Sequence, residues 1–313
     1  MAKKALIYGI LGQDGFYLSK LLSEKGYAVA GVARKECSPP HSGKTYVADL
    51  AGKPDEFLFP INDFLPDEIY NLAGISSVHE AEADPLLCGK VNAEAVQHLL
   101  SRMAASCPRA RFFQASSGYI YSGSGTVDEK SAPNPSSAYG KSKLAAQRHV
   151  EQARAQGAFA CYAILFNHES PMRSPKFVTR KITMGASRIK LGLSKKLALG
   201  SLDARRDWGF AGDYVEAMWL MLQQKQPEDY VIATGESHSV RELCEAAFSH
   251  VGLDYKKFVE TDQSLVRQNE PELRADARCA QKKLGWRPKT GFSELVSMMV
   301  DADLNLLRQG ESI

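Results

Sequence analysis

A tyrosine and a lysine four residues apart are the clearest candidates for chemistry in this 313-residue chain. Tyr139 and Lys143 fall at the start of a predicted helix over 138–156, so their side chains share one face of it. A nearby ammonium group favours the phenolate and lowers the pKa of a tyrosine. We therefore expect Tyr139 to exchange a proton with a hydroxyl or carbonyl group near neutral pH, which suits hydride transfer at a carbinol or ketone carbon.

Two serines support this interpretation. Ser116 and Ser117 follow a predicted strand over 111–115, and a hydroxyl at such a place can donate a hydrogen bond to the same substrate oxygen. The other hydroxyl would cap or line the end of the strand. A Tyr–Lys pair at this spacing is common by chance, but the serines and the preceding glycine turn make chance a weaker explanation.

The glycine turn follows the first predicted strand, with glycines spaced three residues apart at Gly9, Gly12 and Gly15. Residues without side chains let the backbone turn tightly and approach a pyrophosphate, and amides at the next helix N-terminus favour its negative charge. The turn, with Gln13 and Asp14 inside it, therefore predicts a dinucleotide site. A plain structural turn is the alternative.

Charges after the second predicted strand indicate NADP(H) as the cofactor. An NAD-specific fold usually places a carboxylate there against the ribose hydroxyls, whereas Arg34 and Lys35 can neutralise a 2′-phosphate. Two solvated cations at a strand end are the alternative. Asp49 is placed to accept a hydrogen bond from the adenine amino group, and a surface helix cap explains it nearly as well.

Short apolar runs that alternate with amphipathic stretches must position these residues. In the first half we expect strands at 5–8, 28–32, 68–72, 111–115 and 161–165, and helices at 15–25, 91–105 and 138–156. This alternation predicts an α/β fold with a Rossmann-like, doubly wound parallel sheet.

The length suggests more than one domain, at roughly 100–200 residues per domain. We expect an NADP-binding Rossmann domain over 1–170 and a smaller carboxyl-terminal α/β region, 171–313, that binds mainly the substrate. Helices are expected in the second region near 178–190, 213–224, 239–251 and 292–308. Residues 230–233 could form a late strand that returns to the main sheet.

Composition excludes several classes of protein. Lys and Arg outnumber Asp and Glu by 39 to 36, and no continuous basic block suggests nucleic acid or an anionic membrane as a partner. No apolar run approaches the roughly 18–20 residues that span a bilayer, and no signal-peptide core is seen. The six cysteines show no metal-binding spacing. We expect a cytoplasmic protein with free thiols, no metal and a small-molecule substrate.

These motifs together resemble the extended short-chain dehydrogenase/reductases, and within them the GDP-mannose 4,6-dehydratase group. The resemblance covers nearly the whole chain. Its strongest segments are the glycine turn, Tyr70-Asn71-Leu72-Ala73, 166–182, 202–209 and Ala233-Thr234-Gly235-Glu236. The long matches after residue 166 are far more specific than the glycine turn or the Tyr–Lys pair.

The resemblance implies further binding residues. On the cofactor side it implies Leu50, Leu72, Ala73, Ser76, His168 and Arg173, and on the side of a GDP-linked sugar it implies Ser76, Ser117, Asn167, Val178, Lys181, Arg206, Arg267 and Glu270. Arginine and lysine suit a diphosphate, and a carboxylate can accept hydrogen bonds from sugar hydroxyls. Each residue also has a structural explanation: His168 as a core histidine, Arg206 paired with Asp207, and Arg267 as a surface charge.

One departure from the family decides which reaction we expect. The dehydratases resembled here carry Ser-Thr-Ser-Glu-(Met/Leu)-Tyr over residues 116–121, so Ser117 keeps a hydroxyl at the threonine position and Tyr119 replaces the glutamate. In that family the glutamate is the base and acid that removes water across C5 and C6 after C4 is oxidised. A phenol, with an ordinary pKa near ~10, is a poor replacement for a carboxylate as general base.

We therefore expect NADPH-dependent C4 reduction of a GDP-4-keto-6-deoxy-hexose, as in similar reductases that carry a Ser-Ser-Gly run here. Two alternatives stay open: a GDP-mannose 4,6-dehydratase in which Tyr119 or a nearby group takes the elimination role, and a non-catalytic protein that binds a nucleotide sugar or NADP. Leu11 and Ile75 are further departures from the family. The segment after Arg34 is shorter than the loop by which the dehydratases contact a neighbouring subunit in a tetramer, so a homodimer is expected.

Overall fold

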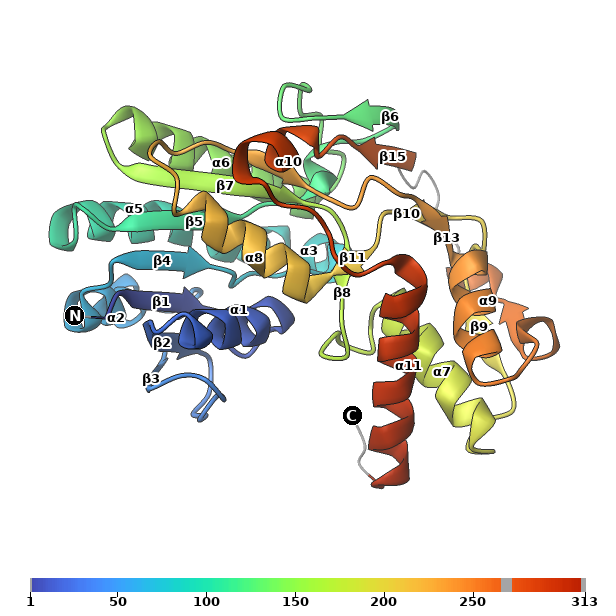
Figure 1. Ribbon diagram of the computed structural model, residues 1–313. Helices are drawn as coiled ribbons and strands as arrows, with labels where there is room; N and C mark the ends of the chain where they lie inside the picture. The colour runs from blue at the N-terminus through green and yellow to red at the C-terminus, as the bar shows by residue number, and fades with distance from the viewer. Residues whose placement is uncertain (1, 266–271, 311–313) are drawn as a thin grey trace.

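A seven-stranded sheet forms the centre of the chain (Figure 1). The computed structural model describes residues 2–265 and 272–310. The strands lie in the order β12-β7-β5-β4-β1-β2-β3, and all their pairings are parallel. Their bounds are β1 (Lys4–Tyr8), β2 (Ala28–Ala33), β3 (Lys44–Val47), β4 (Glu68–Asn71), β5 (Arg111–Ala115), β7 (Phe159–Leu165) and β12 (Tyr230–Ile232). The expected doubly wound sheet is confirmed, and the late strand returns to it as β12 beside β7.

Apolar side chains on both faces explain why these segments form a buried sheet. Leu6 and Ile7 are adjacent in β1, so they point to opposite faces, and both are completely buried. The same holds in β5, where Phe112 and Phe113 belong to different apolar clusters. Continuous apolar runs of this kind are typical of parallel strands that helices cover on both sides.

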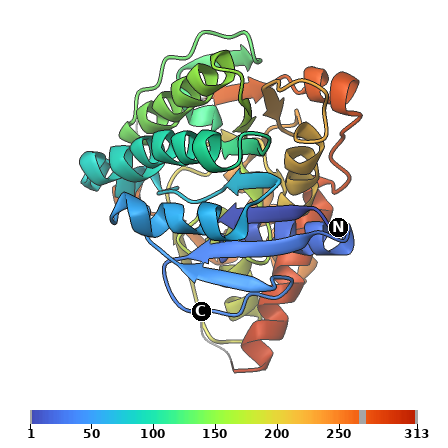
Figure 2. The ribbon, with the colours of Figure 1, turned by 90° about the vertical axis from the view of Figure 1, so that its left-hand side faces the viewer.

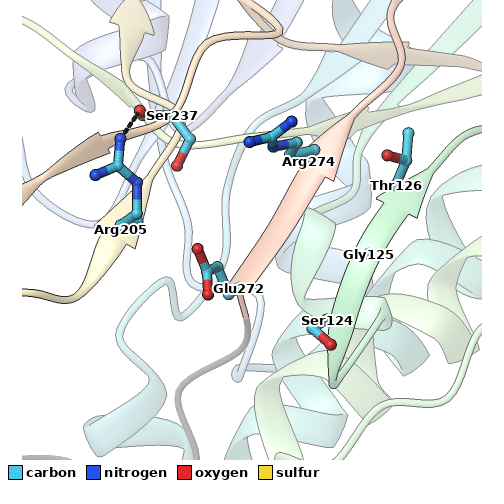
Figure 3. Close-up of a pocket in the computed structure, with 7 residues that line it drawn as sticks. All are labelled: Ser124, Gly125, Thr126, Arg205, Ser237, Glu272 and Arg274. Atoms are coloured by element: carbon cyan, nitrogen blue, oxygen red, sulfur yellow. Dashed lines mark hydrogen bonds between the residues drawn. The ribbon is translucent and has the colours of Figure 1, made fainter.

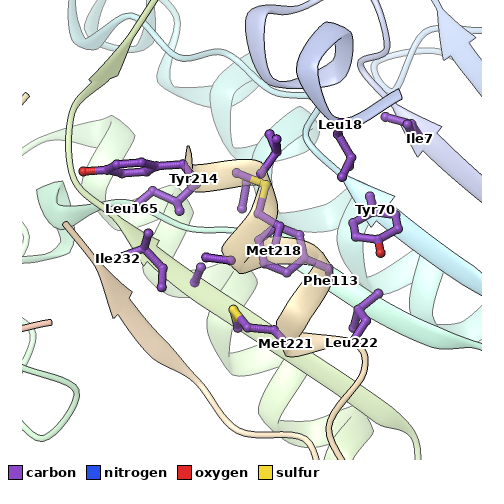
Figure 4. Packing of buried hydrophobic residues seen from close by; sticks show 14 of the residues in the cluster. Ile7, Leu18, Tyr70, Phe113, Leu165, Tyr214, Met218, Met221, Leu222 and Ile232 are labelled. Carbon is purple, nitrogen blue, oxygen red and sulfur yellow. The ribbon is translucent and has the colours of Figure 1, made fainter. Parts of the chain in front are cut away.

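Helices cover the two faces of the sheet (Figure 2). On one face lie α1 (Gln13–Glu24), α8 (Ala211–Met221) and α10 (Arg278–Leu284), and on the other α2 (Pro54–Phe64), α5 (Ala95–Ser106) and α6 (Ala138–Ala155). On the first face, Met218 of α8 and Leu18 of α1 pack in one cluster with Tyr70 and Phe113 of the sheet (Figure 4).

The winding of the sheet changes direction between β1 and β4. From β1 the chain passes through β2 to the edge strand β3, and then crosses to β4 and continues outward to β12. Open α/β sheets bind ligands outside the carboxyl ends of the strands at such a point. The segments that follow β1, β4, β5 and β7 carry the glycine turn, Leu72, the two serines and Asn167.

A smaller group of elements lies beyond the carboxyl ends of the sheet (Figure 1). Its helices α7 (Val178–Lys190), α9 (Val240–His250) and α11 (Phe292–Arg308) pack around one apolar cluster, beside the paired strands β9 (Leu197–Leu199) and β14 (Val259–Thr261). The four helices predicted after residue 170 are confirmed as α7, α8, α9 and α11. The domain division at residue 170 remains a prediction. Three elements that follow residue 170 in sequence, α8, β12 and α10, pack on or join the large sheet.

Several elements were not predicted from the sequence. They are β3, α2, α10, α3 (Val78–Ala83), α4 (Pro85–Gly89), β6 (Ser124–Val127), β8 (His168–Glu169), β9, β10 (Arg205–Arg206), β11 (Gly209–Phe210), β13 (His238–Ser239), β14 and β15 (Glu272–Ala275). The helix predicted over 91–105 begins with a π-helical turn, Lys90–Glu94, before α5. Within the two described ranges, no helix is long and apolar enough to cross a bilayer.

Candidate active site

A cavity of about 430 Å³ is lined by residues from the carboxyl ends of the sheet and from the α7 region. The predicted catalytic residues Ser117, Tyr119, Tyr139 and Lys143 all line it. Other predicted binding residues line it as well: Asp14, Leu72, Ser76, Asn167, His168, Arg173, Val178, Lys181 and Arg206. The fold therefore gathers residues that lie far apart in the sequence, from Asp14 to Leu273.

Tyr139 and Lys143 project from the first turns of α6. Ser137 caps this helix, since its hydroxyl accepts a hydrogen bond from the Gly140 amide at 3.0 Å. Lys143 Nζ lies 5.7 Å from the centre of the Tyr139 ring and donates a hydrogen bond to the Ala115 carbonyl at 3.0 Å. The last carbonyl of β5 thus holds the ammonium group beside the tyrosine.

The predicted lowering of the Tyr139 pKa by Lys143 is wrong in this structure. Burial raises the pKa of Tyr139 to about 12, although a hydrogen bond with Ser117 acts in the opposite direction. Burial also lowers the pKa of Lys143 to about 8. Withdrawal from water penalises the charged form of each group, and this penalty decides both shifts.

A hydrogen-bond network holds α6 against the loop after β4. Asn92, on the π-helical turn, donates from Nδ2 to the Ile75 carbonyl at 3.0 Å and to Ser142 Oγ at 3.1 Å. Ser142 Oγ in turn donates to the Tyr139 carbonyl at 2.7 Å. A Cβ at Gly74 would lie 2.7 Å from Asn92 Oδ1, so only glycine fits there. The network fixes the first turn of α6 and hence the backbone of Tyr139.

The two serines after β5 have different surroundings. Ser116 Oγ accepts a hydrogen bond from the buried Gln147 side chain at 2.7 Å, which ties the strand end to α6. Ser117 Oγ accepts from the Tyr119 amide at 3.3 Å, and its interaction with Tyr139 favours the phenolate. Ser117 is therefore the serine associated with the predicted proton donor, and Ser116 has a structural role.

Tyr119 lies in a 3-10 turn, Gly118–Ile120, directly after the serines. Its ring meets the Tyr139 ring edge to face, with the centres 5.7 Å apart. A Cβ at Gly140 would collide with the Tyr119 carbonyl oxygen, so this turn and α6 pack closely. The side chain at the family's glutamate position thus lies beside Tyr139 on the cavity wall.

Three carboxylates line the cavity, and all are far from Tyr119 in the sequence: Asp14, Glu169 and Asp207. Each has polar partners of its own. Glu169 Oε2 accepts a hydrogen bond from Thr179 at 2.6 Å, and Asp207 accepts three from Thr234 and Gly235. Burial raises the pKa of Asp207 to about 6.

The glycine turn has the close contacts that a dinucleotide site needs. Gly9 has a φ of +84°, and a Cβ there would lie 2.9 Å from the Ala73 amide nitrogen. Gly12 precedes α1 and offers no side chain to the first amides of that helix. A Cβ at Gly15 would collide with the Gly9 carbonyl oxygen. The turn therefore leaves backbone amides of α1 available to a phosphate and fits a dinucleotide.

Other predicted cofactor residues lie outside the cavity lining. Arg34 and Lys35 directly follow β2 and are exposed. Asp49 is exposed too, and its Oδ1 accepts a hydrogen bond from the Ala51 amide at 2.9 Å in a local turn; the cap of the following helix α2 is Lys53 and not Asp49. Leu50 is buried, Ala73 is half-buried beside Gly9, and Gln13 donates to the His168 carbonyl at 2.9 Å.

His168 and Asp14 form an ion pair on the cavity wall. His168 Nε2 lies 2.9 Å from Asp14 Oδ2, its Nδ1 lies 2.8 Å from the Phe166 carbonyl oxygen, and its ring stacks on Tyr214. Burial alone lowers the pKa of His168, but the Asp14 charge outweighs burial and the pKa is raised. Burial likewise raises the pKa of Asp14, and His168 reverses this to a lowered pKa. The pair joins the start of α1 to the segment after β7.

Arg173 belongs to the same wall. Its Nε lies 3.0 Å from Glu169 Oε2, and its guanidinium lies 3.5 Å from the centre of the Phe177 ring. Sequence reasoning found Arg173 but missed Glu169 and Phe177 as wall residues. All three stand in the segment 166–182 that carries the strongest family match, which is the signal that could have found them.

The predicted sugar-side residues divide into two groups. Asn167, Val178, Lys181 and Arg206 line the cavity, and Arg206 donates to the Arg205 carbonyl at 2.6 Å. Arg267 and Glu270 lie outside the described residues.

A second cavity of about 330 Å³ adjoins the first at Arg205 (Figure 3). Arg205 lines both cavities, and its guanidinium donates to the Glu242 carboxylate at 3.0 Å and to the Ser237 carbonyl. The other lining residues come from β6, β15 and residue 237: Ser124, Gly125, Thr126, Ser237, Glu272 and Arg274. Sequence reasoning did not predict any of these.

Comparison with known proteins settles the family. The model of a family described as GDP-mannose 4,6 dehydratase matches residues 6–299. The chain belongs to this family. GDP-mannose 4,6 dehydratase 1 of Arabidopsis thaliana is 42% identical to it, over 98% of this chain and 91% of the relative. Human GDP-mannose 4,6 dehydratase is 40% identical, over 97% and 92%. The expected resemblance is confirmed, and the chain is a GDP-sugar-modifying enzyme of this family.

Solved structures share the fold. RMD from Pseudomonas aeruginosa, complexed with NADPH, superimposes with a TM-score of 0.83 at 24% identity, over 97% of this chain and 98% of that one. UDP-glucose 4-epimerase from Thermus thermophilus, complexed with NAD, gives 0.82 at 25% identity, over 96% and 98%. These likenesses agree with the extended short-chain dehydrogenase/reductase fold of the family.

Replacing Gly15 with alanine should weaken NADPH binding by at least about tenfold, because the new Cβ collides with the Gly9 carbonyl and must displace the turn. Fluorescence titration with NADPH measures this. Gly89→Ala is the matched control, since a Cβ there meets nothing within 4 Å. The control should bind NADPH normally and gain about 0.5–1 kcal/mol of stability from its helical position. Normal binding by folded Gly15→Ala would contradict the assignment.

The Asp14–His168 pair should stabilise the protein over a defined range of pH. His168 has a raised pKa, so its contribution is complete below about pH 6.5 and is lost as pH rises through the raised value. Asp14 has a lowered pKa, so its contribution is complete above about pH 3.8 and is lost as pH falls through the lowered value. Urea unfolding should therefore show Asp14→Asn destabilised by about 2 kcal/mol between these limits, with a smaller difference on either side. A difference independent of pH would contradict the pair.

Proposed function

We propose that this enzyme binds a nicotinamide dinucleotide and a GDP-linked hexose and exchanges hydride at C4 of the sugar. The observation that carries the proposal is that Ser117, Tyr139 and Lys143 line one cavity. Asp14, from the helix that follows the glycine turn, lines the same cavity. Hydride transfer at a carbinol or ketone carbon needs a proton donor and acceptor at the oxygen. Tyr139 supplies it, and Ser117 orients the same oxygen.

The glycine turn and its neighbours would hold the cofactor. Gly9, Gly12 and Gly15 would let the backbone approach the pyrophosphate, and Lys143 would hold the nicotinamide ribose. Arg34 and Lys35, exposed after β2, favour NADP(H) over NAD(H) because they can neutralise a 2′-phosphate. When bound, the nicotinamide supplies or accepts the hydride.

A further group of cavity residues suits a nucleoside diphosphate. Lys181 and Arg206 line the cavity and can neutralise the two phosphates, and Asn167 can hydrogen-bond to them. Val178 offers an apolar contact at 37% exposure. The relatives' names support GDP as the nucleoside diphosphate.

Burial keeps the Tyr139 phenol protonated, so it carries a proton for the oxygen that becomes a hydroxyl when a ketone is reduced. In the oxidative direction the phenol must accept a proton, and the Lys143 ammonium and the Ser117 hydroxyl are the groups placed to stabilise a phenolate.

The overall reaction that we place first is 4,6-dehydration of GDP-mannose, the second of the three functions predicted from the sequence. The names of relatives at 36–43% identity over nearly the whole chain favour it over the reductase that we expected first. In this reaction C4 would be oxidised, and loss of the C5 proton and the C6 hydroxyl as water would give a 4-keto-5,6-ene. Return of hydride at C6 and of a proton at C5 would complete the net loss of one water. Tyr119 would take the place of the glutamate in the elimination.

Reduction at C4 of a GDP-4-keto-6-deoxy-hexose is the second candidate. The observation that favours it is Tyr119, because a phenol is a weak general base and the cavity carboxylates Asp14, Glu169 and Asp207 have polar partners elsewhere. Reduction needs only Ser117, Tyr139, Lys143 and the cofactor. A homodimer in the cytoplasm remains our expectation for either reaction.

Mass spectrometry of two incubations separates the candidates. One contains the protein with GDP-mannose and NADP, and the other contains GDP-4-keto-6-deoxy-mannose and NADPH. Loss of water in the first establishes the dehydratase, and gain of two hydrogens only in the second establishes the reductase. Binding of both ligands without either change would leave the non-catalytic alternative.

Tyr139→Phe should lower turnover by about 10²–10⁴-fold, since it removes the proton donor and acceptor. Binding of NADPH should stay within about twofold, because the ring and its packing are kept. Tyr162→Phe is the control, as its hydroxyl bonds to the exposed Glu151 outside the cavity. Unchanged turnover in Tyr139→Phe would refute the mechanism.

Tyr119 tests the elimination step separately. If Tyr119 serves the dehydratase, Tyr119→Phe should lose water elimination by about 10²-fold or more while C4 oxidation, seen as a burst of NADPH absorbance, persists. Tyr119→Glu should retain or increase elimination. Full dehydration by Tyr119→Phe would show that another group removes the C5 proton.

A further inference from the structure

A buried ion pair joins α7 to the carboxyl-terminal helix α11. Arg180 Nε lies 2.6 Å from Asp303 Oδ1, and the side chains are 6% and 0% exposed. Thr183 Oγ1 donates a hydrogen bond to the other Asp303 oxygen at 2.7 Å. Asp303 stands on the apolar face of α11, in helical register with the buried Val296 and Met299. A carboxylate at such a position must be compensated, and Arg180 is its cationic partner.

Arg180 also reaches the segment 171–177, which follows β8 and precedes α7. Its Nη1 donates to the Pro171 carbonyl and, at 3.3 Å, to the Arg173 carbonyl. A guanidinium can bind one carboxylate and two carbonyls at once because its five N–H donors spread over a rigid plane. Asp303 binds at Nε, and the two carbonyls of the segment bind at Nη1.

The segment held in this way forms part of the cavity wall. Arg173, Lys176 and Phe177 all line the cavity, whereas Arg180 and Asp303 do not. The Arg173 side chain is further set by Glu169 at 3.0 Å and by the Phe177 ring. The position of this wall therefore depends on a contact to a helix that the cavity does not touch.

We propose that Asp303 and Arg180 are positioning residues for the ligand site: through the pair, α11 fixes the 171–177 backbone and so places Arg173 in the cavity. The kinetic part of this inference rests on the proposed function together with the cofactor-side place that the family resemblance implies for Arg173. The structural part does not, because the position of the segment can be measured without a ligand.

The experiment compares a double variant with the wild type. Arg180→Met with Asp303→Leu removes both charges, and apolar replacement of a whole buried pair commonly preserves folding. Arg180→Lys is the second variant, because it keeps a charge for Asp303 but loses the planar fork that reaches the carbonyls. Hydrogen exchange of the amides of Met172, Arg173, Ser174, Lys176 and Phe177, with no ligand present, should be at least about tenfold faster in both variants. The Kd for NADPH should rise about tenfold while kcat at saturating cofactor changes by less than about threefold.

Arg154→Lys is the matched control. Arg154 also joins an aspartate, Asp229, to a backbone carbonyl, that of Ala160 at 2.8 Å, but the cavity lining includes none of the three. This variant should leave exchange of 171–177 and the Kd for NADPH unchanged. Wild-type exchange in a folded double variant or in Arg180→Lys would overturn the proposal, as would the same exchange increase in Arg154→Lys. Faster exchange in a protein that binds no NADPH would uphold the positioning role and refute the proposed function instead.

Discussion

Parallel pairing of the seven strands is the constraint on which the site depends. Strands that run the same way end at one edge of the sheet, so the segments after β1, β4, β5 and β7 meet there although the sequence separates them widely. The glycine turn, the serines and Asn167 each occupy such a segment. The apolar faces that drive this pairing are therefore also what assembles the cavity, and α6 completes it by placing Tyr139 and Lys143 above the end of β5.

Burial at this edge sets the electrostatics of the site. Tyr139 and Lys143 are both withdrawn from water, which raises the pKa of the first and lowers that of the second, so each is pushed toward its neutral form. Asp14 and His168 face the same burial but compensate one another at 2.9 Å, and both are pushed toward their charged forms. One cavity thus holds a proton-exchanging pair whose charged forms burial disfavours, beside a pair whose charged forms are stabilised by their mutual attraction. The difference is that Asp14 and His168 are joined by a direct hydrogen bond, whereas Lys143 donates its hydrogen bond to the Ala115 carbonyl.

Sequence patterns predicted the features that depend on local periodicity. The strand at 111–115 and the helix near 138–156 follow from apolar spacing, and the Tyr–Lys spacing follows from the helix. The sense of the Tyr139 pKa shift could not be predicted in this way, because it depends on burial by other segments. Asn92 was missed for a related reason: its role arises from a π-helical turn and a contact to Ile75, and neither leaves a periodic trace. Asp303 could be noticed in the sequence, because it is a carboxylate at an apolar position of its helix. Its partner on α7, Arg180, is known only from the fold.

Membership of the family and the choice of reaction rest on different parts of the chain. Similarity to the dehydratases extends from residue 6 to 299 and includes the segments that form the walls of the cavity. In the proposed function, the residue that would distinguish elimination from simple reduction is Tyr119, which stands in a three-residue turn and packs on Tyr139 with the ring centres 5.7 Å apart. The backbone of this turn lies close to Gly140 of α6, where a Cβ would collide with the Tyr119 carbonyl oxygen. On this proposal the scaffold determines which ligands meet in the cavity, and the side chain at position 119 would determine whether elimination follows hydride exchange at C4.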